Sequence, residues 1–178
     1  MIVYSATKAE FRDDVKQNRI ETAILAEFER RLGHSTGHAE VESWKNSMVY
    51  MSNVLDDDGI PADAGVAIEY RIPQTAKRVD FILTGRNAEN HGAAVIVELK
   101  QWSDVQATDM DGIVRTFVGG GVREVTHPSY QAWTYAALLR DFNENVQKAA
   151  IALRPCAYLH NLNSADAIKD PRYTDHVL

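Results

Sequence analysis

The sequence predicts a single α/β domain, and two observations carry that prediction. First, apolar residues recur at helical spacing up to about residue 55 and then change to runs of β-branched residues typical of strands. Second, the expected strands are joined by short links, and no Pro-rich or Gly-rich linker divides residues 1–162. The predicted order is α-α-β-β-β-α-β, and residues 163–178 are expected to form a polar C-terminal tail.

Two helices are expected before the first strand. Thr7 and Glu10 in "TKAE" match a capping box, in which each side chain accepts a hydrogen bond from the other residue's backbone N–H at a helix start. An apolar stripe follows at Phe11, Val15, Ile20, Ile24, Leu25, Phe28 and Leu32, and Gly33 is a natural stop. A second stripe consists of Val41, Trp44, Met48, Met51 and Leu55, and "DDDGIPADAG" ends it.

Three strands are expected next, in "VAIEYRI", "RVDFILTG" and "AAVIVELKQW". The links "PQTAK" and "RNAENHG" are short, which favours an antiparallel meander. The second and third strands are apolar on both faces, as expected when helices cover the sheet. Residues 103–126 are predicted to be a polar, glycine-bearing connection, followed by a helix in "SYQAWTYAALLRDFN" and a last strand in "IALRPCAYLHN". The central sheet is therefore expected to be mixed and flanked by helices.

Composition limits the possible locations and partners. Nothing approaches the roughly 18 consecutive apolar residues of a membrane span, no secretory signal is visible, and Cys156 is the single cysteine. We therefore expect a cytoplasmic protein with no membrane partner. The net charge is −6, and no third of the chain has more Lys and Arg than Asp and Glu. Contact with nucleic acid would have to come from a local cluster or from a partner domain.

The chemistry is expected at the end of the third strand, where Glu98 and Lys100 interrupt an apolar run. Residues two apart on a strand share a face, and Asp80 on the preceding strand can lie beside Glu98 if the two strands pair. Converging carboxylates repel each other unless a cation lies between them, and Mg²⁺ accepts one or two carboxylates while keeping waters for substrate phosphate. The Lys100 ammonium could then steady a metal-derived hydroxide or offset charge on a phosphate under attack.

These residues resemble the D…(D/E)xK signature of the PD-(D/E)XK nuclease superfamily, through Asp80 and Glu98-Leu99-Lys100. The order of elements is similar to its restriction-endonuclease-like core, and "QAWTY" matches the Q-x-x-x-Y motif of RecB-like members. The resemblance implies a nuclease that depends on Mg²⁺ or Mn²⁺. Asp80, Glu98 and the main-chain carbonyl of Leu99 would hold the metal, Lys100 would be catalytic, and Gln131 and Tyr135 would orient substrate or Lys100. Val79 stands where the signature has its nominal proline.

A resemblance over nearly the whole chain is to the N-terminal segment of bacterial Schlafen-type (group-three-like) DNA/RNA helicase domain-containing proteins. It is carried by "SWKNS", "GVAIEY", "KRVDFI", "VIVELKQW", "THPSYQAW" and "PCAYLHN". It implies DNA or RNA as partner, a helicase domain in a longer parent protein to which the tail could be a linker, and a role in nucleic-acid processing or phage defence. The chain contains no P-loop, so ATP-driven activity is not expected. A non-cleaving nucleic-acid-binding or regulatory module that keeps the fold is the alternative.

Two further acids are candidates for the site. Glu69 could supply another carboxylate to the metal, or could pair with Arg71 or Arg78 across the sheet, and the sequence does not decide between these roles. Because superfamily members often carry a Glu on a helix before the strands, Glu42 is preferred over Glu21. A surface position for Glu42, supporting Lys45, is the competing interpretation.

Nucleic-acid contacts are expected from a few basic and glycine residues. Gly120 lies in a triple glycine, where backbone N–H groups could approach a phosphate, although a flexible turn explains it equally well. Arg115 and Arg123 flank that segment, and Arg78 precedes the Asp80 strand. Each of these arginines could contact the nucleic-acid backbone or could simply be solvated.

Overall fold

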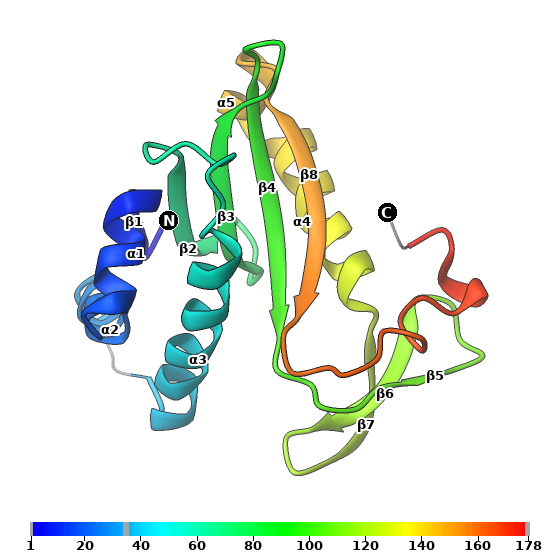
Figure 1. The fold of residues 1–178 in the computed structure, drawn as a ribbon. Helices are drawn as coiled ribbons and strands as arrows, with labels where there is room; N and C mark the ends of the chain where they lie inside the picture. The colour runs from blue at the N-terminus through cyan, green and yellow to red at the C-terminus, as the bar shows by residue number, and fades with distance from the viewer. Residues whose placement is uncertain (1, 34–35, 177–178) are drawn as a thin grey trace.

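The computed structural model describes residues 2–33 and 36–176, and it is a mixed α/β fold (Figure 1). Its centre is a five-stranded sheet in the order β1-β2-β3-β4-β8. The strands are β1 (Tyr4–Thr7), β2 (Gly65–Arg71), β3 (Arg78–Arg86), β4 (Gly92–Lys100) and β8 (Ala152–Leu159). Strands β1 to β4 pair antiparallel, whereas β8 pairs parallel to β4. The expected three-stranded meander and later strand are therefore confirmed, and β1 is an additional edge strand.

Helices lie on both faces of this sheet (Figure 1). Three lie on one face, α1 (Lys8–Lys16), α2 (Ile20–Leu32) and α3 (His38–Val54), and α4 (Pro128–Phe142) with the short α5 (Glu144–Lys148) lies on the other. The capping box of Thr7 and Glu10 is present, and Gly33 ends α2 with a φ of 73°. The first expected helix is interrupted at Asn18, whose φ is 53°. Among the described residues, no helix is both long and apolar enough to cross a membrane.

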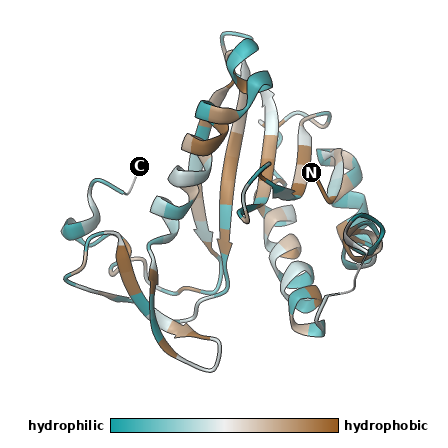
Figure 2. Cartoon of the chain, turned by 180° about the vertical axis from the view of Figure 1, so that it is seen from behind, coloured by the Kyte–Doolittle hydropathy of each residue, from teal (hydrophilic) through white to brown (hydrophobic). Residues whose placement is uncertain are grey.

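The two faces of the sheet bury two separate cores, and Figure 2 shows apolar residues concentrated along the central strands. The core under α1, α2 and α3 includes Phe81 and Val97, which are cross-strand partners. The core under α4 includes Ile82 and Ile96, the next pair in the same register. Alternate residues of β3 and β4 thus point to opposite faces, which explains why both strands are apolar throughout.

Residues 103–126, expected to be a polar connection, instead form a second, three-stranded antiparallel sheet. Its strands are β5 (Gln106–Ala107), β6 (Ile113–Val118) and β7 (Gly121–Thr126). Gly119 and Gly120 have φ values of 58° and 80°, so they make the two-residue turn that a tight hairpin requires. The glycine pair between two β-branched runs was the sequence signal for this hairpin.

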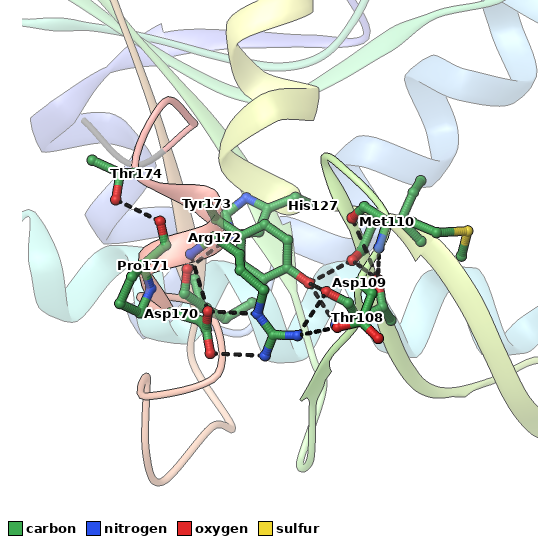
Figure 3. Close-up of polar contacts among 11 residues, drawn as sticks. Thr108, Asp109, Met110, His127, Asp170, Pro171, Arg172, Tyr173 and Thr174 are labelled. Atoms are coloured by element: carbon green, nitrogen blue, oxygen red, sulfur yellow. Dashed lines mark hydrogen bonds and ion pairs between the residues drawn. The ribbon is translucent and has the colours of Figure 1, made fainter.

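The C-terminal segment, expected to be a tail, packs against this second sheet (Figures 1 and 3). Tyr173, in the short helix η1 (Pro171–Tyr173), is fully buried, and its OH donates to the Ile113 carbonyl at 2.6 Å. The same OH accepts from the Thr108 N–H at 2.7 Å, and Arg172 pairs with Asp109 at 2.7 Å. A third core contains Trp102, Val105, Val114, Ile168 and Tyr173. Residues 177–178 of the expected tail lie outside the described residues.

Candidate active site

A backbone distortion at Glu69 shapes the site. Ile68 pairs with Phe81 and Tyr70 with Val79, but between them Glu69 has a φ of 54°, in the left-handed region that non-glycine residues rarely adopt. As a result Ile68 packs into the core under α3 while Tyr70, two residues later, packs against the core under α4. The carboxylate of Glu69 faces α3, where the Trp44 indole N–H donates to it at 2.9 Å.

Asp80 lies where β3 and β4 stop pairing. The ladder between these strands ends at Phe81 and Val97, and one further step in the same register places Asp80 opposite Glu98. The carboxylate Oδ2 of Asp80 accepts a hydrogen bond from the backbone N–H of Leu99 at 2.8 Å. A side chain of β3 thus satisfies a backbone donor of β4 beyond the end of the ladder.

Glu98 is the centre of a buried polar cluster. Its side chain is 2% exposed, and its Oε1 lies 2.6 Å from Lys100 Nζ and accepts a 2.6 Å hydrogen bond from Gln131 Nε2. Gln131 also donates to the Tyr135 OH at 2.7 Å, so both residues of the Q-x-x-x-Y pattern reach the cluster from α4. The other carboxylate oxygen of Glu98, Oε2, is buried and has no hydrogen-bond partner.

The pKa values of the three buried carboxyl groups are raised. Burial raises the pKa of Glu98 to about 8, the charge of Asp80 adds to that shift, and Lys100 opposes it. Burial raises the pKa of Asp80 as well, against the Leu99 N–H and Lys100. Burial raises the pKa of Glu69 to about 7, opposed first by Arg78 and then by Trp44. Burial, the first cause of all three shifts, makes ionisation of these carboxyl groups unfavourable, and a divalent cation that binds the ionised forms would offset that cost.

A small cavity of about 160 Å³ separates α3 from the sheet beside these carboxylates. Asp80, Glu69, Arg78, Leu99 and Ser47 line it, among others. Arg78 contacts Glu40 at 2.9 Å and lies 3.0 Å from Glu69 Oε2, although the latter contact is not aligned as a hydrogen bond. Arg71 and Arg78 were the expected partners of Glu69 within the sheet, and Arg78 makes this contact.

Several expected site residues lie away from the cluster. Glu42 is on the exposed side of α3, 4.0 Å from His38, and Glu40 of the same helix reaches Arg78 instead. Lys45 pairs with Glu21 at 3.6 Å, not with Glu42. The hairpin residues expected to contact nucleic acid are also outside the cluster. Arg115 pairs with Glu124 at 2.7 Å, and Arg123 and Gly120 belong to the exposed β6–β7 turn region.

The residues present can be tested against the Mg²⁺ or Mn²⁺ that the sequence implies. Within residues 2–33 and 36–176, no three His, Cys, Asp or Glu side chains form a group that could hold a metal ion. Mg²⁺ needs fewer protein ligands, because it is often held by one or two carboxylates, with waters and substrate phosphate completing the shell. The unpartnered Oε2 of Glu98, a carboxyl group close enough to Asp80 to feel its charge, is the donor atom that such an ion would use.

Two contributors to the site were missed by sequence reasoning. Trp44 was expected in an apolar helical stripe, with base stacking as the less favoured role, yet its indole N–H donates to Glu69. Glu40, which contacts Arg78, was not considered. The positive φ of Glu69 has no signal in a β-branched strand sequence.

Comparison with family models, curated proteins and solved structures finds no match for this chain.

Proposed function

We propose that the chain is a metal-dependent nuclease of the PD-(D/E)XK type that hydrolyses phosphodiester bonds of DNA or RNA. The observation that supports this most strongly is Glu98, whose Oε1 holds Lys100 and Gln131 while Oε2 is buried and unpartnered next to Asp80. A purely structural buried carboxylate is expected to have both oxygens satisfied, because an unpartnered charged oxygen is costly. A buried carboxylate with one unpartnered oxygen, close to a second carboxylate, fits a cation site better.

The proposed roles follow from the contacts. Asp80, Glu98 and the Leu99 carbonyl would hold Mg²⁺ or Mn²⁺, which supplies Lewis-acid polarisation of phosphate and a more acidic water. Lys100 presents an ammonium 2.6 Å from Glu98, where it can stabilise negative charge that develops on an attacked phosphate. Gln131 orients Glu98 through its amide, and Tyr135 accepts the second hydrogen bond of that amide.

The resemblance to Schlafen-type helicase proteins supports a setting in bacterial nucleic-acid processing or phage defence, in the cytoplasm and beside a helicase domain. The β6–β7 hairpin lies beyond the end of β4 and carries Arg115, Gly120 and Arg123 (Figure 1). We assign it to the nucleic-acid backbone, because Arg115, Gly120 and Arg123 are exposed and the hairpin lies beyond the end of the strand that carries Glu98 and Lys100.

The alternative is a nucleic-acid-binding or regulatory module that keeps this fold without cleaving. Two observations favour it: the net charge of −6 leaves little positive charge for substrate capture, and the described residues contain no three-ligand metal group. The two candidates differ in whether a cation at Asp80 and Glu98 leads to cleavage.

A cleavage assay separates them. The wild-type protein is incubated with single- and double-stranded DNA and RNA in Mg²⁺, in Mn²⁺ or in a chelator, beside Glu98→Gln and the matched exposed control Glu42→Gln. We expect metal-dependent cleavage by the wild type and by Glu42→Gln, and a loss of about 10²-fold or more in Glu98→Gln, since oriented charged groups in active sites typically contribute that much. Nucleic-acid binding without cleavage by the wild type would establish the binding module instead.

A further inference from the structure

A second polar network adjoins the carboxylate cluster, and no proposed role uses it. Ser47 on α3 has its Oγ 3.2 Å from His160 Nε2, just after β8. His160 Nδ1 lies 3.0 Å from Asn161 Oδ1. Gln101, directly after Lys100, donates from Nε2 to Ser47 Oγ at 3.1 Å, and Asn161 Nδ2 donates to the Gln101 carbonyl at 3.4 Å. Together with the Gln101 main-chain carbonyl, these side chains form a closed ring of hydrogen bonds.

The ring determines where the protons lie. Asn161 donates through Nδ2, so its Oδ1 is the acceptor and His160 Nδ1 must carry the hydrogen. His160 Nε2 then has a free lone pair and accepts from the Ser47 hydroxyl. Ser47 Oγ also accepts from Gln101 Nε2, and Ser47 is one of the residues that line the cavity. His160 is therefore a neutral imidazole with its basic nitrogen directed at a serine hydroxyl.

The network connects the cavity with the surface. Ser47 is 5% exposed and lines the 160 Å³ cavity together with Asp80, Leu99 and Arg78. His160, which is only partly buried, contacts Ser47 and does not itself line the cavity. A proton that leaves the cavity through Ser47 would thus arrive at a group in contact with solvent.

The acidic side chains that line the cavity are Glu40, Glu69 and Asp80. Arg78 lies 2.9 Å from Glu40 and 3.0 Å from Glu69, which also accepts from Trp44, and Asp80 would be engaged as a ligand when a cation is bound. Arg78 itself carries its full set of protons as a cation. The titratable side chains that face His160 are Tyr50 of α3, stacked at 4.3 Å between ring centroids, and Tyr158 of β8, edge-on at 5.8 Å. Burial lowers the pKa of His160, and the hydrogen bond to Asn161 opposes that shift, so the imidazole stays neutral near pH 7.

We propose that His160, acting through Ser47, is the proton acceptor for the water that attacks the phosphodiester in this cavity. The inference rests on the proposed nuclease function. The water O–H bond breaks, its proton moves to Ser47 Oγ, and the Ser47 proton moves to His160 Nε2. The water oxygen forms the new bond to phosphorus, and the departing ester oxygen keeps the electron pair of the P–O bond and takes a proton from solvent. The imidazolium returns its extra proton to solvent, which leaves a phosphate monoester and an alcohol.

The first test is the pH profile of metal-dependent cleavage. At saturating metal, which keeps Asp80 and Glu98 ionised, the wild-type kcat/KM should fall on the acid side with an apparent pKa below that of free histidine, since protonated His160 cannot accept. His160→Gln and Ser47→Ala should each lose this acid limb and about 10²-fold in rate, the lower end for general-base catalysis. The double variant should be no worse than either single one, because both residues act in one path. Exposed His91→Gln is the matched control and should behave as wild type.

A second readout, the nitrogen-15 spectrum of the imidazole, does not depend on activity, and it should show His160 neutral at pH 7 with its hydrogen on Nδ1. In the cleavage assay, free imidazole should restore part of the rate of His160→Ala. An Nε2–H or doubly protonated His160, or variants that keep the wild-type rate and acid limb, would overturn the relay alone. A wild type that cleaves no nucleic acid with any metal would overturn the nuclease proposal and the relay with it.

Discussion

The Asp80 carboxylate accepts the backbone N–H of Leu99 at 2.8 Å, so the end of the β3–β4 ladder is closed by a side chain instead of a main-chain carbonyl. This contact holds a charged group in the gap between two central strands, next to Glu98. The distortion at Glu69 opens the neighbouring β2–β3 pair at the same level of the sheet. Three acidic residues on three adjacent strands thereby converge at one end of the sheet.

Without a divalent cation, the free energy of unfolding should fall as the pH rises from about 4.5 to about 8. The unfolded Glu98 carboxyl has a pKa near 4.5 and the folded one about 8, so the native state binds more protons in this window and stability declines with pH. Glu69 contributes in the same direction up to about pH 7. Urea denaturation in a chelator from pH 5 to pH 8.5 measures the slope.

Glu98→Gln should flatten this pH dependence, because the amide does not titrate. Glu42→Gln, at an exposed position of α3, should keep the wild-type slope. Equal slopes for the wild type and Glu98→Gln would show that Glu98 does not have the raised pKa that its burial implies.

Mg²⁺ or Mn²⁺ should raise the melting temperature, because a cation that binds the native carboxylates stabilises the folded state. At a concentration one hundred times the Kd the gain is about 2.7 kcal/mol, and each kcal/mol corresponds to about 2–4 °C for a chain of this size. Asp80→Asn should abolish the shift in a thermal melt. Asp141→Asn, in a surface pair with Arg140, should retain it. A wild type with no metal-dependent shift would contradict the assigned ligand pair.

Lys100→Met should fold and should still respond to metal, yet cleave about 10²-fold more slowly or worse. Methionine keeps most of the apolar stem and removes the ammonium that lies 2.6 Å from Glu98 and 5.5 Å from the centre of the Trp102 ring. Steady-state cleavage rates and melting curves measured together distinguish the two roles. If Lys100 only neutralises the charge of Glu98, the variant should lose stability and keep its cleavage rate. Lys148→Met, at an exposed lysine, is the control.

Tyr173→Phe should cost about 1–3 kcal/mol of unfolding free energy, because the buried Thr108 N–H loses its acceptor and the Ile113 carbonyl keeps only the Thr108 hydroxyl as a side-chain donor (Figure 3). Tyr173→Ala should cost about 3–5 kcal/mol through the cavity it leaves. Phe142→Ala, at a side chain that is 81% exposed, should change stability by less than about 0.5 kcal/mol. Chemical denaturation checks all three, and a neutral Tyr173→Ala would mean that the C-terminal segment does not stabilise the second sheet.

The sequence by itself determined the features that depend on neighbours along the chain. The helix start at Thr7, the stop at Gly33 and the antiparallel meander follow from capping, turn and alternation patterns, which act over a few residues. The same local periodicity puts Gln131 and Tyr135 on one face of α4, where a hydrogen bond joins them.

Tertiary structure alone decided what depends on distant residues. The left-handed Glu69, the contact of Trp44 with it, and the burial of Tyr173 against β6 each require partners 25 or more positions away, and no local pattern encodes such partners. On α3 the orientation toward the sheet selects Glu40 over Glu42, because positions two apart on a helix point to nearly opposite sides. Long-range packing against the sheet sets that rotation, and with it which acid of α3 meets Arg78 at the cavity.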